Sequence, residues 1–106
     1  MKIDIHRKTF VLANRTGGVS GPAIHPIAVR MVYEAANAVN VPVIGMGGIA
    51  SAEDAIEMLL AGASAVSVGT ANFHDPAVTV KIIEGIERYM KDQGFKNVKE
   101  MIGIVR

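Results

Sequence analysis

The chain has 106 residues, of which half are apolar and a fifth are charged, and its formal net charge is +1. This is the balance of an ordinary globular protein, and it gives no reason to expect a nucleic acid or an anionic membrane as a partner. The absence of cysteine excludes disulfides, a thiolate nucleophile and a cysteine-bound iron–sulfur cluster within this chain. No apolar run is long enough to span a bilayer and no signal peptide is recognisable, so we expect a cytoplasmic protein.

The first part of the chain predicts a hairpin, a loop and a helix. Residues 3–5 and 9–12 are short β-prone runs separated by polar residues, which is typical of a hairpin. Residues 14–22 hold three glycines and a proline and cannot form a regular element. Apolar residues at helical spacing then predict a helix over 26–39, which ends at Asn40.

The middle of the chain predicts a strand, a helix and a second strand. The apolar run 41–46 is the first strand, and the second covers 65–68. Between them, residues 51–54 form a capping-box pattern, with a hydroxyl at the cap and a carboxylate three residues later, and Gly62 ends the helix. Because both strands are continuous apolar runs rather than alternating ones, they favour a parallel sheet covered by helices.

The last part of the chain predicts one long helix and one short one. Asp75 is a good N-cap and Pro76 is favoured at the first helical position, so the long helix is expected to begin there. Gly94 lies beyond its end, and Asn97 is expected to cap a final short helix.

Glycines follow both predicted strands, at residues 45–49 and 68–70. The carboxyl ends of parallel strands meet at one edge of a sheet, so the N–H groups of Gly48, Gly69 and Thr70 could converge on one dianion, with the Thr70 hydroxyl as a further donor. The last two units of a (β/α)₈ barrel hold a phosphate in this way. The alternative is that these glycines only allow tight turns and close contacts between helix and sheet.

A complete (β/α)₈ barrel needs about 250 residues, so the expected fold is α/β, as the C-terminal portion of such a barrel with parallel strands alternating with helices and a short N-terminal hairpin. A partial barrel leaves sheet edges uncovered, and we expect these to make the chain a homo-oligomer. The rival interpretation is that the chain is a non-catalytic structural module that only self-associates.

Other polar residues favour structural roles. The three histidines, His6, His25 and His74, are dispersed without metal-ligand spacing, so no metal site is expected. Glu53 and Asp54 lie in the first turn of a predicted helix, where capping is favoured over acid–base chemistry.

Three stretches of the chain, residues 17–30, 42–55 and 60–73, resemble the dihydroorotate dehydrogenase family, and the resemblance extends over residues 1 to about 90. The sequence of these stretches is most similar to the bacterial and archaeal branch of the family, which couples to NAD through a second subunit that carries an iron–sulfur cluster and FAD. The resemblance implies an FMN-dependent barrel that oxidises dihydroorotate to orotate in pyrimidine biosynthesis. A sugar-phosphate enzyme is a weaker alternative, because residues 20–22 and 69–73 argue against it.

The resemblance also implies roles for six residues. By their match to the family, Ser20 and Gly21 belong to the loop beside the FMN ribityl chain and phosphate. Gly47 and Gly48 belong to the phosphate loop after strand seven, and Gly69 and Thr70 to the phosphate loop after strand eight. The family's base, a cysteine in this branch, lies upstream and has no counterpart here. We therefore expect no catalytic residue in this chain and no turnover by the chain alone.

For the organisation of the chain, we expect one partial-barrel domain over residues 1–106. Within it, residues 1–22 are the hairpin and glycine loop, residues 23–94 are β/α units seven and eight, and residues 95–106 are a C-terminal helix and tail. In the complete enzyme, the resemblance implies an iron–sulfur and FAD electron-transfer subunit as partner.

Overall fold

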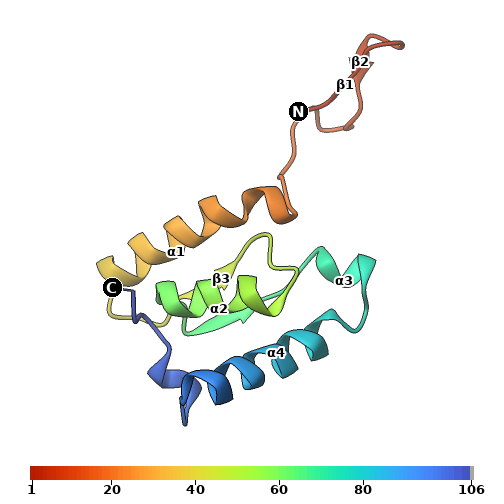
Figure 1. Ribbon diagram of the computed structural model, residues 1–106. Coiled ribbons are helices and arrows are strands. Elements are labelled where there is room, and N and C mark those ends of the chain that lie inside the picture. The colour runs from red at the N-terminus through yellow and green to blue at the C-terminus, as the bar shows by residue number, and fades with distance from the viewer. Residues whose placement is uncertain (106) are drawn as a thin grey trace.

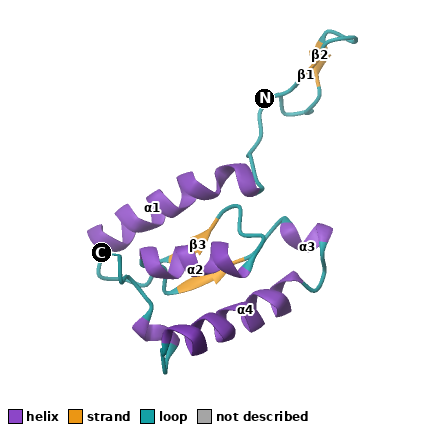
Figure 2. Ribbon diagram, viewed as in Figure 1, coloured by secondary structure: helices purple, strands orange, loops and turns teal. Residues whose placement is uncertain are grey.

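The computed structural model describes residues 1–105 and centres on a small parallel sheet. Strand β3 (Ile44–Met46) pairs in parallel with β4 (Ala65–Ser67), with Ile44 opposite Ala65. Helix α2 (Ala52–Ala61) is the crossover between them and packs against both α1 (His25–Ala38) and α4 (Val78–Gln93). In Figure 2, α2 lies in front of the two strands, with α1 above it and α4 below it. The predicted α/β arrangement with parallel strands is confirmed.

Short elements complete the fold. The hairpin consists of β1 (Ile3–Asp4) and β2 (Thr9–Phe10), which pair antiparallel as predicted. A 3₁₀ turn, η1 (Pro22–Ile24), leads into α1, and η2 (Val98–Glu100) follows α4. The Lys99 N–H donates to the Asn97 side chain at 2.9 Å, so the predicted cap of this last element is confirmed.

Local sequence fixes the ends of α2 and α4. At the start of α2, the Ser51 hydroxyl accepts from the Asp54 N–H at 3.2 Å, and the Asp54 carboxylate accepts from the Ser51 N–H at 2.9 Å. Both halves of the predicted capping box are therefore present. The helices end at Gly62, with φ 121°, and at Gly94, with φ 76°, both conformations that disfavour side chains with a Cβ.

The start of α4 differs from the prediction. The helix begins at Val78 rather than at Pro76, and a short helix that the sequence did not reveal, α3 (Ala71–His74), precedes it. A residue before proline is pushed toward extended backbone, and Asp75 has φ −140° and ψ 101°. Its carboxylate accepts from the Ala77 N–H at 3.0 Å. Residues 75–77 thus form a capped turn between two helices.

Both sheet strands are shorter than predicted, because each has only one neighbour in the sheet. Pairing covers Ile44 to Met46 against Ala65 to Ser67, whereas the apolar runs extend over 41–46 and 65–68. The flanking residues lie in loops, although the Ser64 N–H still donates to the Val43 carbonyl at 2.8 Å.

Helices cover one face of this sheet and leave the other bare. On the covered face Gly45 is buried, and an added Cβ there would lie 3.0 Å from the Ala63 Cβ and 3.1 Å from the Met58 Cβ, so only glycine lets the strand approach α2 this closely. On the other face, Ile44 is 58% exposed and Met46 is 59% exposed. In a complete barrel this second face would be the inner wall.

The N-terminal hairpin lies apart from the helices and the parallel sheet, joined to α1 by an extended segment (Figure 1). Just after the hairpin, the Arg15 guanidinium folds back and lies 5.5 Å from the centre of the Phe10 ring in β2. Among the described residues, no helix is both long and apolar enough to cross a membrane.

Candidate functional site: a pocket at the ends of the parallel strands

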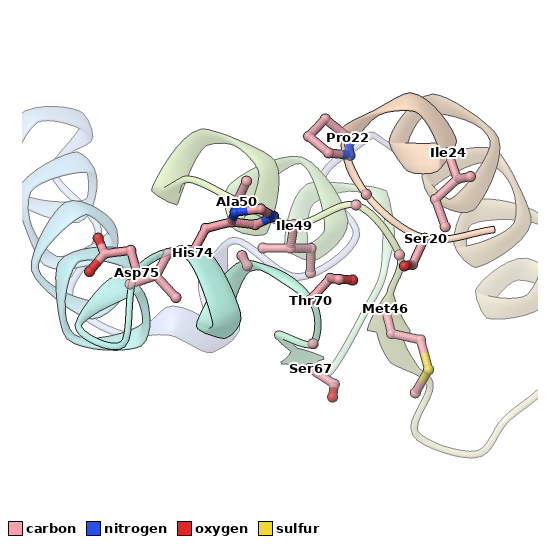
Figure 3. Close-up of a pocket in the computed structure, with 16 residues that line it drawn as sticks. Ser20, Pro22, Ile24, Met46, Ile49, Ala50, Ser67, Thr70, His74 and Asp75 are labelled. Carbon is pink, nitrogen blue, oxygen red and sulfur yellow. The ribbon is translucent and has the colours of Figure 1, made fainter. Parts of the chain in front are cut away.

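A pocket of about 700 Å³ lies where β3 and β4 end. The η1 turn closes one side, and α3 closes another (Figure 3). The six residues that the sequence singled out all line this pocket: Ser20, Gly21, Gly47, Gly48, Gly69 and Thr70. Three separate segments of the chain therefore meet at one place.

The turn after β3 requires glycine at Gly48. Its φ of +69° lies in the left-handed region, which side chains disfavour. An added Cβ would also lie 2.7 Å from the Gly21 carbonyl oxygen and 2.8 Å from the His25 Cβ. No ordinary Cβ tolerates contacts this short, so the turn, the η1 loop and the start of α1 fit together only without a side chain at this position.

The three backbone donors that the sequence predicted at this pocket have no partner in residues 1–105. The N–H groups of Gly48, Gly69 and Thr70 make no hydrogen bond to any described residue. Figure 3 shows the Thr70 and Ser20 hydroxyls on facing sides of the opening. These are the donors that the sequence predicted, and they are available to an anion.

The turn after β4 is held by a residue that the sequence analysis missed. The Asn72 side-chain amide donates to the Val68 carbonyl at 2.8 Å and to the Gly69 carbonyl at 3.0 Å. Asn72 thereby braces the backbone on which the Gly69 and Thr70 N–H groups lie. An asparagine just after a strand–glycine turn is the sequence signal that could have indicated this brace.

Among the residues that the structure describes, no lysine or arginine lines the pocket, so its attraction for an anion would come from backbone dipoles and hydroxyls. At its far end lie His74 and Asp75. A hydrogen bond from Lys81, at 2.6 Å, and one from the Ala77 N–H lower the pKa of Asp75. The Asp75 charge is thus already compensated by Lys81.

The N-terminus of α2 also lies beside the pocket, and the two N–H groups that precede this helix are already used. The Asp54 carboxylate accepts from the N–H groups of Ala50 and Ser51, each at 2.9 Å. Burial opposes the charge on Asp54, but these hydrogen bonds and the nearby His25 outweigh it and lower the pKa of this carboxyl. The expectation that Asp54 caps the helix is confirmed.

Replacing Asp54 with alanine is expected to reduce the free energy of unfolding by about 1 kcal/mol, because the two hydrogen bonds that the Asp54 carboxylate accepts are lost. The lowered pKa means that the carboxylate stabilises the fold above its ordinary pKa of 3.8, and that this contribution disappears as the pH falls through the lower folded-state value. Urea unfolding of both proteins at neutral and acidic pH measures the effect. A difference that stays constant down to the most acidic pH would contradict this account.

His25, which the sequence analysis treated as one of three dispersed histidines, is buried directly behind the pocket. Its Nδ1 lies 2.9 Å from the Gly47 carbonyl oxygen, and its Nε2 lies 3.0 Å from a Glu57 carboxylate oxygen. No metal-ligating cluster of three or more His, Cys, Asp or Glu residues exists in the described part of the chain.

Comparisons with known proteins point to one family. A sequence model of dihydroorotate dehydrogenase matches residues 1–90. The "Dihydroorotate dehydrogenase B (NAD(+)), catalytic subunit" of Lachnoclostridium phytofermentans is 58% identical over 106 residues, which are 100% of this chain and 35% of that protein. The protein of the same name from Alkaliphilus metalliredigens is 59% identical over 103 residues, which are 97% of this chain and 34% of that protein. The chain thus spans about a third of the length of these curated relatives.

Solved structures agree with the sequence comparisons. Ligand-free dihydroorotate dehydrogenase from Eimeria tenella superposes with a TM-score of 0.80 at 29% identity, over 90% of this chain and 28% of that one. The same enzyme in complex with ferulenol gives a TM-score of 0.77 at 30% identity, over 88% of this chain and 26% of that one. The fold of this chain is therefore the fold of one part of a larger barrel.

Proposed function

Because the chain belongs to the dihydroorotate dehydrogenase family, we propose that it is the C-terminal third of such an enzyme and that it binds the phosphate end of FMN. In this proposal, β3 and β4 are strands seven and eight of the barrel. The complete enzyme oxidises dihydroorotate to orotate in pyrimidine biosynthesis.

The observation that carries the proposal is the convergence of three glycine-containing segments on one pocket with unpaired backbone donors. A phosphate dianion accepts several hydrogen bonds at once, and N–H groups from two neighbouring turns can meet this demand without a cationic side chain. The crowding around Gly48 supports the same interpretation, since it brings the backbone of this turn to the pocket wall. The pocket residues therefore fit the phosphate of FMN.

Bound FMN would supply the acceptor for the hydride that leaves dihydroorotate. The residues of this chain would hold the cofactor at one end: the Gly48, Gly69 and Thr70 N–H groups would bind the phosphate, and Ser20 and Gly21 would flank the ribityl chain. The general base that this oxidation needs is a cysteine in this branch of the family, and the chain has no cysteine. The chain by itself would bind and orient, without turnover.

The proposal extends to a partner. The relatives in Lachnoclostridium and Alkaliphilus are named as catalytic subunits of an NAD-linked enzyme. A catalytic subunit implies at least one other subunit, and in this branch we expect an electron-transfer protein that carries an iron–sulfur cluster and FAD.

Titration of the chain with FMN tests the binding proposal. We expect FMN to bind, with quenching of flavin fluorescence, and riboflavin to bind at least about tenfold more weakly, because riboflavin lacks the phosphate that accepts the backbone hydrogen bonds. Equal affinity for the two flavins, or no binding of either, would contradict the proposal.

A second candidate function, self-association, is favoured by the bare face of the sheet. Ile44 and Met46 are both more than half exposed there, and burial of such a face against a second copy would remove apolar surface from water. We expect sedimentation to give a mass above that of a monomer and the Ile44→Lys variant to be monomeric. Ile83→Lys is the matched control, because Ile44 and Ile83 are both 58% exposed but Ile83 lies on α4. A monomeric starting protein would exclude this function.

A further inference from the structure

The buried His25 has a hydrogen-bonding geometry that the binding of phosphate by the pocket does not by itself explain. It is the one buried polar or charged residue among those the structure describes, and it begins α1. Its ring lies between the turn after β3 and helix α2, and it does not line the pocket.

Both partners of the ring are hydrogen-bond acceptors. Nδ1 faces the Gly47 carbonyl at 2.9 Å, and Nε2 faces the Glu57 carboxylate at 3.0 Å. A neutral imidazole has a single N–H and can satisfy one of them, whereas an imidazolium has two and satisfies both. A second carboxylate, that of Asp54, lies 3.8 Å from Nε2. Among residues 1–105, these two carboxylates of α2 are the ion-pair partners of the ring.

The bond to Gly47 determines where the next N–H points. The Gly47 carbonyl and the Gly48 N–H belong to one peptide unit, and the described chain contains no cis peptide bond. In a planar trans peptide the C=O and N–H groups point in opposite directions. Fixing the Gly47 carbonyl on His25 therefore turns the Gly48 N–H away from α1, and Gly48 lines the pocket.

This turn has no side chain of its own that could hold it. Gly47 and Gly48 both have positive φ, at 123° and 69°, and a glycine pair is free to rotate its shared peptide unless a neighbour restrains it. His25 supplies this restraint from α1, and Glu57 holds the ring from α2.

We propose that His25, as an imidazolium shared between the Gly47 carbonyl and the Glu57 carboxylate, is a positioning residue that aims the Gly48 N–H at the phosphate. This inference rests on the proposed binding of FMN by the pocket. His25 does not touch the ligand. It acts through the peptide unit between Gly47 and Gly48.

The first test uses flavin affinity in the full chain. His25→Phe keeps a flat ring but has no N–H, so we expect FMN affinity to fall about tenfold, the effect of losing one charge-assisted hydrogen bond. Riboflavin affinity should not change, whereas general damage to the fold would weaken both flavins. His6→Phe, on the exposed hairpin, is the control for the same substitution. Equal FMN affinity of the wild type and the His25→Phe variant would overturn the inference while leaving the proposed function intact.

The second test does not require a variant that lacks the buried ring. Nitrogen-15 NMR of the histidine rings in the wild-type chain at neutral pH should find both nitrogens of His25 protonated. In Glu57→Gln, an amide that can donate or accept replaces the acceptor, and we expect the ring to keep a single proton, on Nδ1. A neutral His25 ring in the wild type would overturn the inference. Failure of the wild type to bind FMN at all would instead overturn the proposed function, and with it the role of His25.

Discussion

Replacing Gly48 with valine is expected to weaken the binding of FMN by about 100-fold or more, which corresponds to about 2.7 kcal/mol. Two effects act together. Valine is strongly disfavoured at a φ of +69°, and its Cβ would lie 2.7 Å from the Gly21 carbonyl oxygen. Relief of the backbone strain or of the short contact moves the turn or the η1 loop, so the N–H groups that surround the pocket no longer converge.

Fluorescence titration with FMN measures this loss, and circular dichroism checks that the helices remain. Gly18→Val is the matched control, because an added Cβ at Gly18 meets nothing within 4 Å and Gly18 does not line the pocket. Undiminished FMN affinity in the Gly48→Val variant would contradict the assignment of this turn to the phosphate.

An exchange of segments between this chain and a relative is expected to give a protein with the activity proposed for the complete enzyme. The Lachnoclostridium phytofermentans protein aligns with the chain over 106 residues, 35% of its length. Substituting this chain for the aligned residues is expected to give a protein that binds FMN and oxidises dihydroorotate. The rate should exceed that of the isolated chain by about 10²-fold or more, since the remaining two thirds of the relative would supply the general base.

The physical reason is that different parts of the barrel supply the cofactor site and the general base. The chain contributes the pocket at the ends of β3 and β4, while Ile44 and Met46 are exposed on the face that would be the inner wall of a complete barrel. Dihydroorotate-dependent reduction of a dye measures the activity. Gly48→Val in the same chimera should abolish the activity, and Gly18→Val should preserve it. A folded chimera that contains FMN and is inactive would show that this chain cannot replace the relative's own segment.

Features that depend on neighbouring residues in the sequence were predicted well. The capping box at Ser51 and Asp54, the ends of α2 and α4 at Gly62 and Gly94, and the cap at Asn97 all agree with the structure. Each of these is decided within about one helical turn, by hydrogen bonds between a side chain and nearby N–H groups or by the freedom of glycine. The predicted start of α4 was wrong because the Asp75–Pro76 pair fits a turn as well as a helix start. In the structure this pair follows the end of α3 and forms the turn.

The sequence alone determined the α/β class, the two glycine turns that follow parallel strands and the six residues that now line one pocket. The class and the two turns follow from local patterns, since glycines at the ends of consecutive parallel strands meet at one edge of the sheet, whereas the full set of six residues came from the match to the family. Only the tertiary structure revealed the role of His25. Its partners Gly47 and Glu57 lie 22 and 32 residues away, and a buried histidine has no periodicity or spacing that distinguishes it from an exposed one. The packing of α1 against α2 brings these groups together. One face of the sheet stays bare, because no element within residues 1–105 covers it.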